Sequence, residues 1–300
     1  MIKDSILEAI GKTPLVRINR MNPNNRVILS AKIESANPSG SLKDRIALYI
    51  ISKAEEEGTL SRDKVILEST SGNMGISLAM VGVVKGYRVA VTLLESASIE
   101  KRSILESYGV EIFSIPAEKG PDGARDEAMR LYERYPGKYF LAGQNFNKNN
   151  MLAHYETTGT EIWEDTNGAV DYFVAGIGTS GTVMGVGKRL KELKPGVKII
   201  GVEPHAKHKV YGLKNLEEAR NPEIYDERYI DETIRVSDEE AITTTRHLIR
   251  KEGIFAGISS GAVMFAALKK IRVLDKGNMV VLLADGGERY LSTGLLTDNN

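Results

Sequence analysis

One lysine of this 300-residue chain stands where a side-chain amine could do covalent chemistry. Lys43 follows the turn-forming residues 37–42 and precedes apolar residues at helical spacing over 46–54. This pattern predicts a helix that begins near Ser41, a suitable N-cap, and ends near Gly58. Because the positive end of a helix dipole disfavours a cation, we expect Lys43 to release its proton readily, and a neutral amine can form a Schiff base. The same residues taken alone also fit a solvent-exposed helix start.

A glycine-rich loop in the second half of the chain has the features of a phosphate cradle. The loop 176–181 follows an apolar run and opens a helical one, so its glycines allow close backbone approach at a helix N-terminus. Thr179, Ser180 and Thr182 add hydroxyl donors. Glu203 follows at roughly the 20-residue interval of a dinucleotide-binding fingerprint, so the loop alone also fits an NAD-binding site. A glycine-rich connection without a ligand is the third interpretation.

Three more polar loops follow expected strands or open expected helices. One places Thr70, Ser71 and Asn73 around a glycine, and its backbone N–H groups and hydroxyls could hold a carboxylate. Residues of these types are also ordinary helix caps. The loops 257–261 and 284–293 are likewise built from small and polar residues. Ligands of parallel α/β sheets bind at the carboxyl ends of the strands, so we expect the loops to converge on one site.

The elements that must position these loops are apolar strands alternating with helices. Expected strands are 13–18, 27–33, 64–68, 88–93, 111–115, 139–142, 171–175, 197–203 and 279–284. The later expected helices are 98–107, 123–134, 150–163, 181–193, 237–251 and 260–270. Such alternation predicts parallel sheets with helices on both faces. We therefore predict an α/β protein of two doubly wound halves that meet near Gln144, with the N-terminal residues packed on the second half.

Composition limits the classes of partner. The chain has 40 basic and 40 acidic residues, so neither nucleic acid nor an anionic membrane is an expected partner. It has no cysteine, which excludes disulfides and thiolate metal sites. The N-terminal residues lack the apolar core of a signal peptide, and no apolar run reaches membrane length. These features predict a soluble, cytoplasmic protein without a bound metal.

Taken together, the motifs resemble those of the cysteine synthase family of pyridoxal-phosphate β-replacement enzymes. The similarity runs in order and at the family's spacing through residues 10–16, 37–45, 70–75, 178–182, 257–261 and 285–293. The resemblance implies fold type II and a homodimer. It also implies a cleft between a smaller mobile α/β domain, residues 36–144, and a larger cofactor-binding domain, residues 1–35 plus 145–300.

The resemblance also implies a role for each motif. Lys43 would hold pyridoxal 5'-phosphate as a Schiff base and then act as general base for the Cα proton. Asn73 would contact the cofactor's 3′-oxygen, and Gly257 would lie beside the cofactor. The cofactor phosphate would be bound by Gly178, Thr179, Ser180, Gly181 and Thr182. The substrate carboxylate would be bound by the loop residues Thr70, Ser71, Asn73 and Met74 together with Gln144.

Three positions depart from the family pattern, of which Leu42, in place of a valine or isoleucine, is a conservative packing change. Gly286 stands where the family commonly has a serine whose hydroxyl meets the pyridine nitrogen, and Met74 replaces a threonine. The stretch 210–215 resembles the branch that uses O-phospho-L-serine, with Lys214 at the position of a basic residue. Lys214 would then contact the substrate phosphate, unless it is simply a solvated loop lysine. The expected reaction is β-replacement of O-phospho-L-serine by a sulfur nucleophile, through an aminoacrylate, to give L-cysteine.

Other functions stay open at this stage. The family resemblance also allows two other activities, that of an O-acetylserine sulfhydrylase and that of the core of a cystathionine β-synthase. An NAD-binding dehydrogenase would use the glycine-rich loop and leave Lys43 without a role. A non-catalytic binding protein that kept the fold would not need a reactive Lys43 or a phosphate-binding loop. The sulfur donor is not given by the sequence. A sulfur-carrier protein or a serine acetyltransferase would be a partner consistent with the resemblance.

Overall fold

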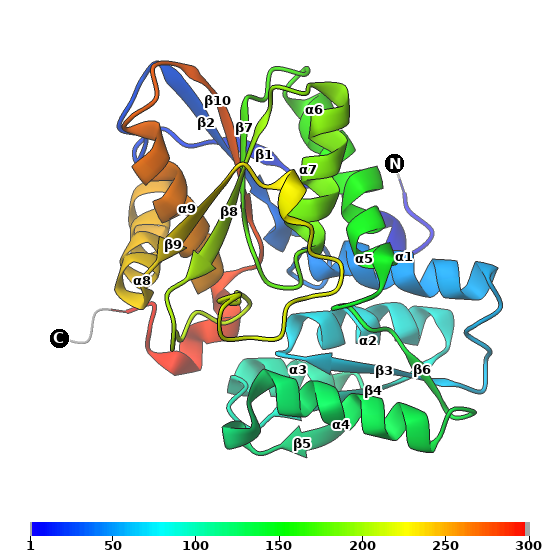
Figure 1. Ribbon diagram of the computed structural model, residues 1–300. Helices are drawn as coiled ribbons and strands as arrows, with labels where there is room; N and C mark the ends of the chain where they lie inside the picture. Colours follow the sequence, from blue (N-terminus) through cyan, green and yellow to red (C-terminus); the bar gives the residue numbers. More distant parts are fainter. Residues whose placement is uncertain (1, 298–300) are drawn as a thin grey trace.

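Two separate β-sheets form the framework of the protein (Figure 1). The structure is a computed structural model, and it describes residues 2–297. Within this range the larger sheet has six strands in the spatial order β1-β2-β10-β7-β8-β9, and the smaller has four in the order β5-β4-β3-β6. The larger sheet comprises β1 (Leu15–Arg17), β2 (Val27–Ile33), β7 (Tyr172–Gly176), β8 (Lys198–Pro204), β9 (Glu232–Val236) and β10 (Gly277–Leu283). The smaller comprises β3 (Val65–Thr70), β4 (Arg88–Leu94), β5 (Glu111–Ile115) and β6 (Tyr139–Leu141).

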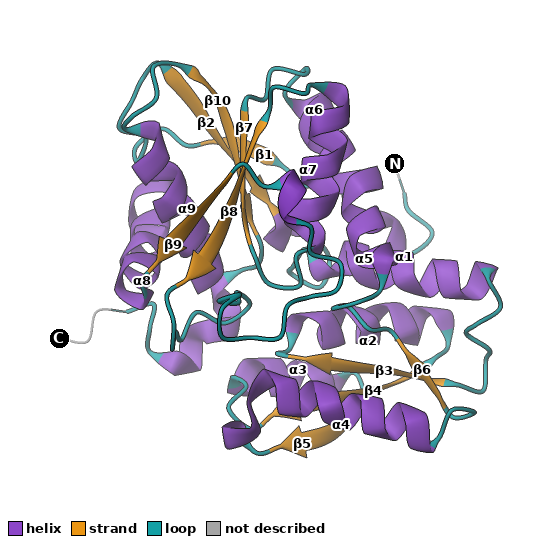
Figure 2. Cartoon of the chain, viewed as in Figure 1, coloured by secondary structure: helices purple, strands orange, loops and turns teal. Residues whose placement is uncertain are grey.

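Helices cover both sheets and fill the space between them (Figure 2). The α-helices are α1 (Lys43–Glu56), α2 (Asn73–Lys85), α3 (Ile99–Ser107), α4 (Gly120–Arg134), α5 (Lys148–Ala153), α6 (Gly159–Asp165), α7 (Gly181–Leu193), α8 (Asp238–His247) and α9 (Ile258–Ile271). Short 3-10 helices are η1 (Ile6–Ala9), η2 (Glu34–Ala36), η3 (Ala117–Lys119), η5 (Glu227–Tyr229) and η7 (Gly287–Thr293), and η4 (His154–Thr158) and η6 (Leu248–Glu252) are π-helical.

The predicted α/β fold is confirmed. Helices α2 and α4 pack on the smaller sheet, and α7 and α9 pack on the larger one. Strand β7 shows why both faces are covered, because Phe173 and Ala175 belong to one apolar cluster and the intervening Val174 belongs to another. Strands β1 and β2 place the N-terminal residues on the larger sheet, as expected.

Four elements differ from the expectations, and one of them is the helix expected over 237–251, which is divided into α8 and the π-helical η6. The helix expected over 150–163 is divided into α5, the π-helical turn η4 and α6. The opening strand β1 is an antiparallel edge in a sheet whose other described neighbours are parallel. Strand β9 was not expected, because polar and charged residues alternate with few apolar ones, and only Ile234 and Val236 are buried. The division into domains at residues 36 and 144 stays a prediction, although the smaller sheet is built entirely from residues 65–141.

The order of strands creates a switch point in each sheet. In the larger sheet β7 continues outward through β8, while its other neighbour β10 arrives from the far end of the chain. In the smaller sheet β3 continues through β4, while β6 lies on its other side. Loops leave the carboxyl ends of neighbouring strands in opposite directions at such points, which leaves a crevice for a ligand.

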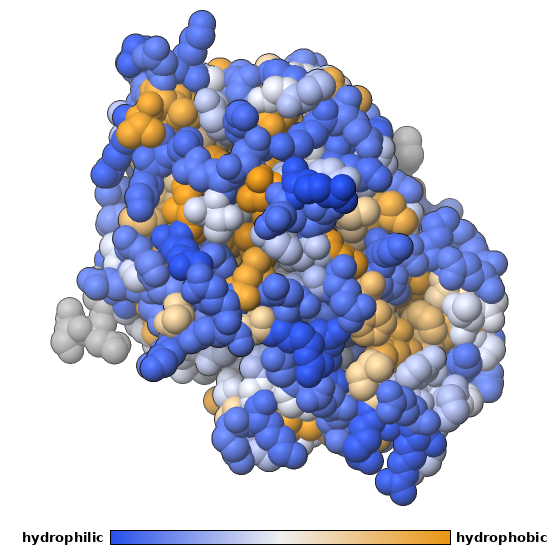
Figure 3. Space-filling model, in the orientation of Figure 1, coloured by the Kyte–Doolittle hydropathy of each residue, from blue (hydrophilic) through white to orange (hydrophobic). Residues whose placement is uncertain are grey.

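The face of the molecule in Figure 3 is mainly hydrophilic, with apolar side chains gathered in smaller patches. In the part of the chain that the structure describes, no helix is both long enough and apolar enough to cross a membrane.

A buried network of charged side chains fixes the start of α1. The Arg45 guanidinium donates through Nε to Glu34 Oε2 at 2.7 Å and through Nη1 to Glu161 Oε1 at 2.6 Å. Lys32 Nζ lies 2.9 Å from Glu161 Oε2 and 2.8 Å from Asp165 Oδ2. The network therefore joins α1 to η2 and α6. It holds the first turn of α1, and with it Lys43, against the larger part of the structure.

We expect Arg45→Met to lower the free energy of unfolding by about 3 to 5 kcal/mol, because Glu34 and Glu161 would lose a fully buried partner. Chemical denaturation measures the loss. The matched control is Arg130→Met, which breaks an exposed pair with Glu127 and should leave the unfolding midpoint unchanged. Equal midpoints for the two variants would contradict this account of the network.

Candidate functional site

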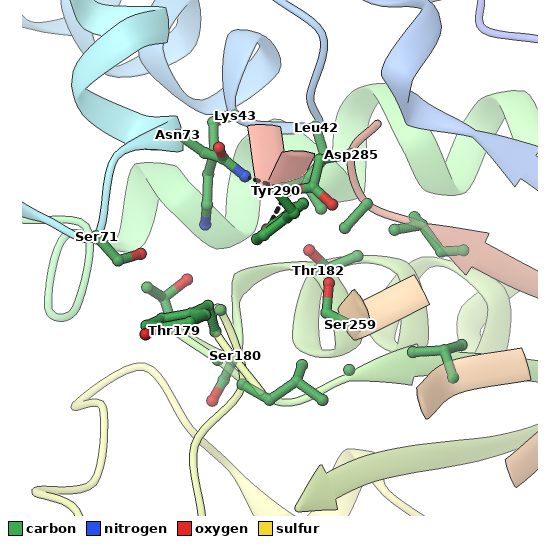
Figure 4. A pocket seen from close by; sticks show the side chains of 18 of the residues that line it. Leu42, Lys43, Ser71, Asn73, Thr179, Ser180, Thr182, Ser259, Asp285 and Tyr290 are labelled. Carbon is green, nitrogen blue, oxygen red and sulfur yellow. Dashed lines mark hydrogen bonds between the residues drawn. The ribbon is translucent and has the colours of Figure 1, made fainter. Parts of the chain in front are cut away.

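A pocket lies where loops from both sheets meet at the start of α1 (Figure 4). Seven of the predicted site residues line it, namely Lys43, Ser71, Asn73, Gly178, Thr179, Ser180 and Thr182. It is also lined by residues to which no role was given, among them Lys101, Tyr211, Ser259, Asp285 and Tyr290. The other predicted residues, Thr70, Met74, Gln144, Gly181, Lys214, Gly257 and Gly286, are not part of this lining.

Lys43 is the first residue of α1, and its side chain reaches into the pocket towards the loop that carries Thr179 (Figure 4). The expected cap is shifted by one residue. Leu42 occupies the N-cap position, while the Ser41 hydroxyl accepts from the Lys43 N–H at 3.3 Å. Burial lowers the pKa of Lys43 to about 8, and the nearby Glu68 carboxylate opposes this effect. The sequence argument attributed an easily released proton to the helix dipole, whereas loss of hydration is the main cause found here.

The loop between β7 and α7 is shaped for an anion. Ser180 adopts a left-handed conformation with φ 70° at the N-cap of α7. A Cβ at Gly178 would lie 2.3 Å from the Gly212 carbonyl oxygen, and one at Gly181 would lie 1.9 Å from Asn150 Oδ1. The Ser180 hydroxyl is buried and has no hydrogen-bond partner among the described residues. An unpaired hydroxyl at the start of a 13-residue helix fits a bound phosphate.

Two buried residues behind this loop were missed by the sequence analysis as parts of a site. Asn150 Nδ2 donates to the Gln144 carbonyl at 2.7 Å and to Thr179 Oγ1 at 2.9 Å, so it joins two loops that hold predicted site residues. His154 lies 3.2 Å through Nε2 from Thr182 Oγ1, and burial lowers its pKa well below the ordinary value. A neutral His154 therefore supports the loop. The signal available in the sequence was the four-residue spacing between Asn150 and His154 in the helix expected over 150–163.

The loop after β3 is held in shape by its own threonine. Thr70 Oγ1 accepts from the N–H of Gly72 at 2.9 Å, and Gly72 has φ 131°. Ser71 is exposed on the side of the pocket, as Figure 4 shows. Gln144 is buried and donates from Nε2 to the Ser69 carbonyl at 3.1 Å. Met74 is 1% exposed within the apolar core, so its side chain is not available to a ligand.

Asp285 connects the loop after β10 to the loop after β3. Its Oδ2 accepts from Asn73 Nδ2 at 2.7 Å and from the Tyr290 hydroxyl at 2.7 Å (Figure 4). Arg289 donates to the remaining amide oxygen of Asn73. Burial, with Asp285 alongside, raises the pKa of Tyr290 well above its ordinary value, so this hydroxyl stays a donor. Both ends of the Asn73 amide are thereby fixed by the C-terminal segment.

The region around Gly286 differs from what the sequence suggested. A Cβ at Gly286 would lie 2.0 Å from Glu288 Oε2, and Gly286 does not reach the pocket lining. Gly257 donates its N–H to the Asp285 carbonyl at 3.0 Å, and a Cβ there would lie 2.1 Å from Asp285 Oδ1. A serine of this half of the chain that does line the pocket is Ser259, in the first turn of α9. The sequence showed that Gly286 cannot supply a hydroxyl, and it gave Ser259 no role.

Lys214 lies next to the site rather than in its lining. Its N–H donates to the Ile177 carbonyl at 2.8 Å, and its Nζ donates to Asn145 Oδ1 at 3.0 Å. Burial lowers its pKa, with Asp122 opposing. Its positive charge also contributes to the lowered pKa of Lys43, so the two ammonium groups are electrostatically coupled. Among residues 2–297 no group of three or more histidine, cysteine, aspartate or glutamate side chains could hold a metal.

Comparisons with known proteins agree on one family. The family model described as "Pyridoxal-phosphate dependent enzyme" matches residues 6–285. "Cysteine synthase" of Aquifex aeolicus is 41% identical over an alignment 306 positions long, which covers 99% of this chain and 94% of that protein. A solved cysteine synthase of Entamoeba histolytica has a TM-score of 0.93 at 38% identity and covers 100% of this chain and 93% of its own. O-ureido-L-serine synthase has a TM-score of 0.94 at 38% identity, with 100% and 97% covered.

Glu68, at the end of β3, provides a test of the site's electrostatics. Burial raises its pKa to about 7, although the Gln144 and Ser69 N–H groups oppose this. Between pH 4.5 and 7 the folded protein therefore binds more protons than the unfolded chain, so Glu68 lowers stability as the pH rises. We expect Glu68→Gln to remove this loss. The variant should gain up to about 3 kcal/mol over the parent protein between pH 4.5 and 7.5.

Urea denaturation of the ligand-free parent and variant at a series of pH values measures the difference. A stability difference that stays constant across this range would contradict the burial of a carboxyl group at Glu68.

Proposed function

Because the chain belongs to the family of pyridoxal-phosphate-dependent enzymes, we propose that it is a cysteine synthase, which replaces the β-substituent of an activated L-serine with sulfur. One observation carries the proposal. The amine of Lys43, with a pKa of about 8, shares a pocket with an unpaired hydroxyl at the start of α7 and with the polar loop after β3. A reactive amine, a phosphate cradle and a carboxylate loop are the three parts that this chemistry needs.

The residues present fit pyridoxal phosphate. Gly178, Thr179, Ser180, Gly181 and Thr182 would hold the phosphate group, and Lys43 would hold the aldehyde carbon. Asn73 and the Ser259 hydroxyl line the same pocket and would meet the polar atoms of the ring. When bound, the cofactor withdraws electrons from the substrate and so makes its Cα–H bond acidic. The NAD-dependent dehydrogenase that the glycine-rich loop alone allowed is wrong, because the chain belongs to a pyridoxal-phosphate family.

The chain's own residues would carry the proton and the substrate. The loop Thr70–Asn73 and Gln144 would hold the substrate carboxylate. The Lys43 amine would take the Cα proton, the Cβ–O bond would break with its electron pair leaving on oxygen, and the sulfur anion would form the Cβ–S bond. Lys43 would then return the proton to Cα. Overall, an activated L-serine and hydrosulfide give L-cysteine and the oxyanion of the leaving group.

The identity of the leaving group rests on two different observations. Similar solved structures from Entamoeba histolytica are cysteine synthases of the O-acetylserine sulfhydrylase type, which supports O-acetyl-L-serine. The partly buried ammonium of Lys214, coupled electrostatically to Lys43, supports O-phospho-L-serine. We propose O-acetyl-L-serine as a substrate and O-phospho-L-serine as the alternative that Lys214 would favour. A homodimer and closure of the 36–144 unit over the substrate also belong to this proposal.

We expect the purified protein to show the visible absorbance of a protein-bound Schiff base, and Lys43→Ala to lose it. Loss of the general base should also lower kcat by about 100-fold or more. Absorbance spectra and a cysteine-formation assay measure the two effects. The control is Lys53→Ala on the same helix, whose ammonium pairs with Glu56 at the surface. A Lys43→Ala variant with the parent spectrum and rate would overturn the assignment.

We expect Lys214→Ala to raise KM for O-phospho-L-serine about tenfold or more, because the dianionic phosphate would lose a charged donor. KM for O-acetyl-L-serine should change little. Both substrates are assayed with sulfide, and in parallel with L-homocysteine to detect cystathionine formation. Equal effects on both activated serines would remove Lys214 from substrate selection, and turnover with homocysteine alone would favour a cystathionine β-synthase.

A further inference from the structure

A second lysine lines the pocket and has no role in the chemistry described above. Lys101 lies in α3 and is 3% exposed. It shares the pocket lining with Lys43 and Ser71 from the first half of the chain and with Tyr211 and Tyr290 from the second. A buried ammonium in a ligand pocket requires an explanation, because removing a charge from water is costly unless a partner replaces the water.

The structure supplies Lys101 with aromatic rings and not with an anion. Its Nζ lies 4.4 Å from the centroid of the Tyr290 ring and 5.7 Å from that of Tyr211. Across residues 2–297 this ammonium has no hydrogen-bond acceptor and no ion pair. The strongest acidic influence is Asp285, whose Oδ2 is bonded to Asn73 and Tyr290 and whose Oδ1 has no hydrogen-bond partner among the described residues, Lys101 included.

Another buried lysine shows what a structural ammonium looks like in this protein. Lys32, with a fully buried side chain, contacts Glu161 at 2.9 Å and Asp165 at 2.8 Å and donates to the Thr13 carbonyl. Lys101 has none of these partners, although it is almost as deeply buried. The contrast indicates that the missing partner of Lys101 is a ligand.

The side chain of Lys101 is held in place by packing. A Cβ on Gly72 would lie 2.5 Å from Lys101 Cδ and 2.9 Å from Cγ, so the aliphatic stem lies directly against the loop after β3. The ammonium beyond this stem is fixed beside that loop. Tyr211, its other neighbour, is 39% exposed and lines the same pocket. Burial lowers the pKa of Lys101 to about 8, with Arg289 adding to the effect and Asp285 and Glu100 opposing it.

We propose that Lys101 binds the anionic group that is exchanged at the β-carbon, which is either the departing oxyanion of the activated serine or the incoming hydrosulfide. This inference rests on the proposed function. The α-carboxylate has its own loop of N–H and hydroxyl donors, so the anion left for Lys101 is the one lost or gained at the β-carbon. The two tyrosine rings add a cation–π environment that keeps the ammonium in place when no anion is bound.

The variant Lys101→Met keeps the aliphatic stem against Gly72 and removes only the charge, and Lys101→Arg restores a cation. A matched control is Lys138→Met, because the Lys138 ammonium also lies over a tyrosine ring, 4.7 Å from the centroid of Tyr139, outside the pocket lining. The cofactor absorbance of each holoenzyme reports whether the site is intact.

Titrations of each half-reaction identify which anion Lys101 binds. We expect Lys101→Met to raise the half-saturating concentration of sulfide or of the activated serine about tenfold, and Lys101→Arg to recover much of this loss. A change confined to sulfide identifies the nucleophile, and one confined to the activated serine identifies the leaving group. L-Alanine has the carboxylate but no leaving group, so its affinity should stay the same. An equal loss for L-alanine, or no loss for either substrate, overturns the proposal.

A direct binding measurement makes the test independent of turnover. Equilibrium dialysis of the holoenzyme with labelled sulfate should show one site that competes with sulfide in the parent and in Lys138→Met and is lost in Lys101→Met. Sulfate binding that is unchanged in Lys101→Met contradicts the proposal. If the holoenzyme turns over no activated serine at all, the proposed function fails, while this measurement still decides whether Lys101 binds an anion.

Discussion

The position of one helix start is the constraint on which the rest of the site depends. Arg45, two residues after Lys43, is bonded to carboxylates of η2 and α6, and these lie outside the smaller sheet. The next turns of α1 are held by apolar packing, since Ile46 and Ile50 share a core cluster with residues of α2 and of β7. Helix α1 therefore has a fixed place between the two sheets. Because Lys43 is the first residue of α1, the position of its amine is fixed as well.

Two oppositely charged groups then set the chemistry of the pocket. Lys43 and Glu68 are both removed from water, which favours the neutral form of each, and each partly restores the charge of the other. Their pKa values of about 8 and about 7 mean that both groups titrate close to neutral pH. A lysine in this condition can serve as a nucleophile and as a base without a metal ion or a cysteine nearby. The site thus obtains its reactivity from burial.

The sequence predicted the fold well because the strands of the two sheets are strongly apolar and the loops between them carry distinctive small residues. The glycine-rich turn before α7 is a local signal that marked the loop 176–181 as a ligand loop. Lys43 owed its predicted role to the family resemblance, because its own surroundings in the sequence also fit a solvent-exposed helix start. Asn150, Ser259 and Lys101 escaped prediction. Their importance comes from neighbours far away in the chain, such as Thr179 for Asn150 and Tyr290 for Lys101. Strand β9 escaped because it is short and has only two apolar residues, Ile234 and Val236.

The left-handed Ser180 has a consequence for how the empty protein behaves. A non-glycine residue in this conformation costs of order 1 to 3 kcal/mol, and its buried hydroxyl has no partner within residues 2–297 to offset that. An anion that accepts a hydrogen bond from this hydroxyl would therefore stabilise the folded loop. Binding of the cofactor should therefore raise the free energy of unfolding of the protein. Resistance to heat and to proteases would then report how much of the protein carries its cofactor.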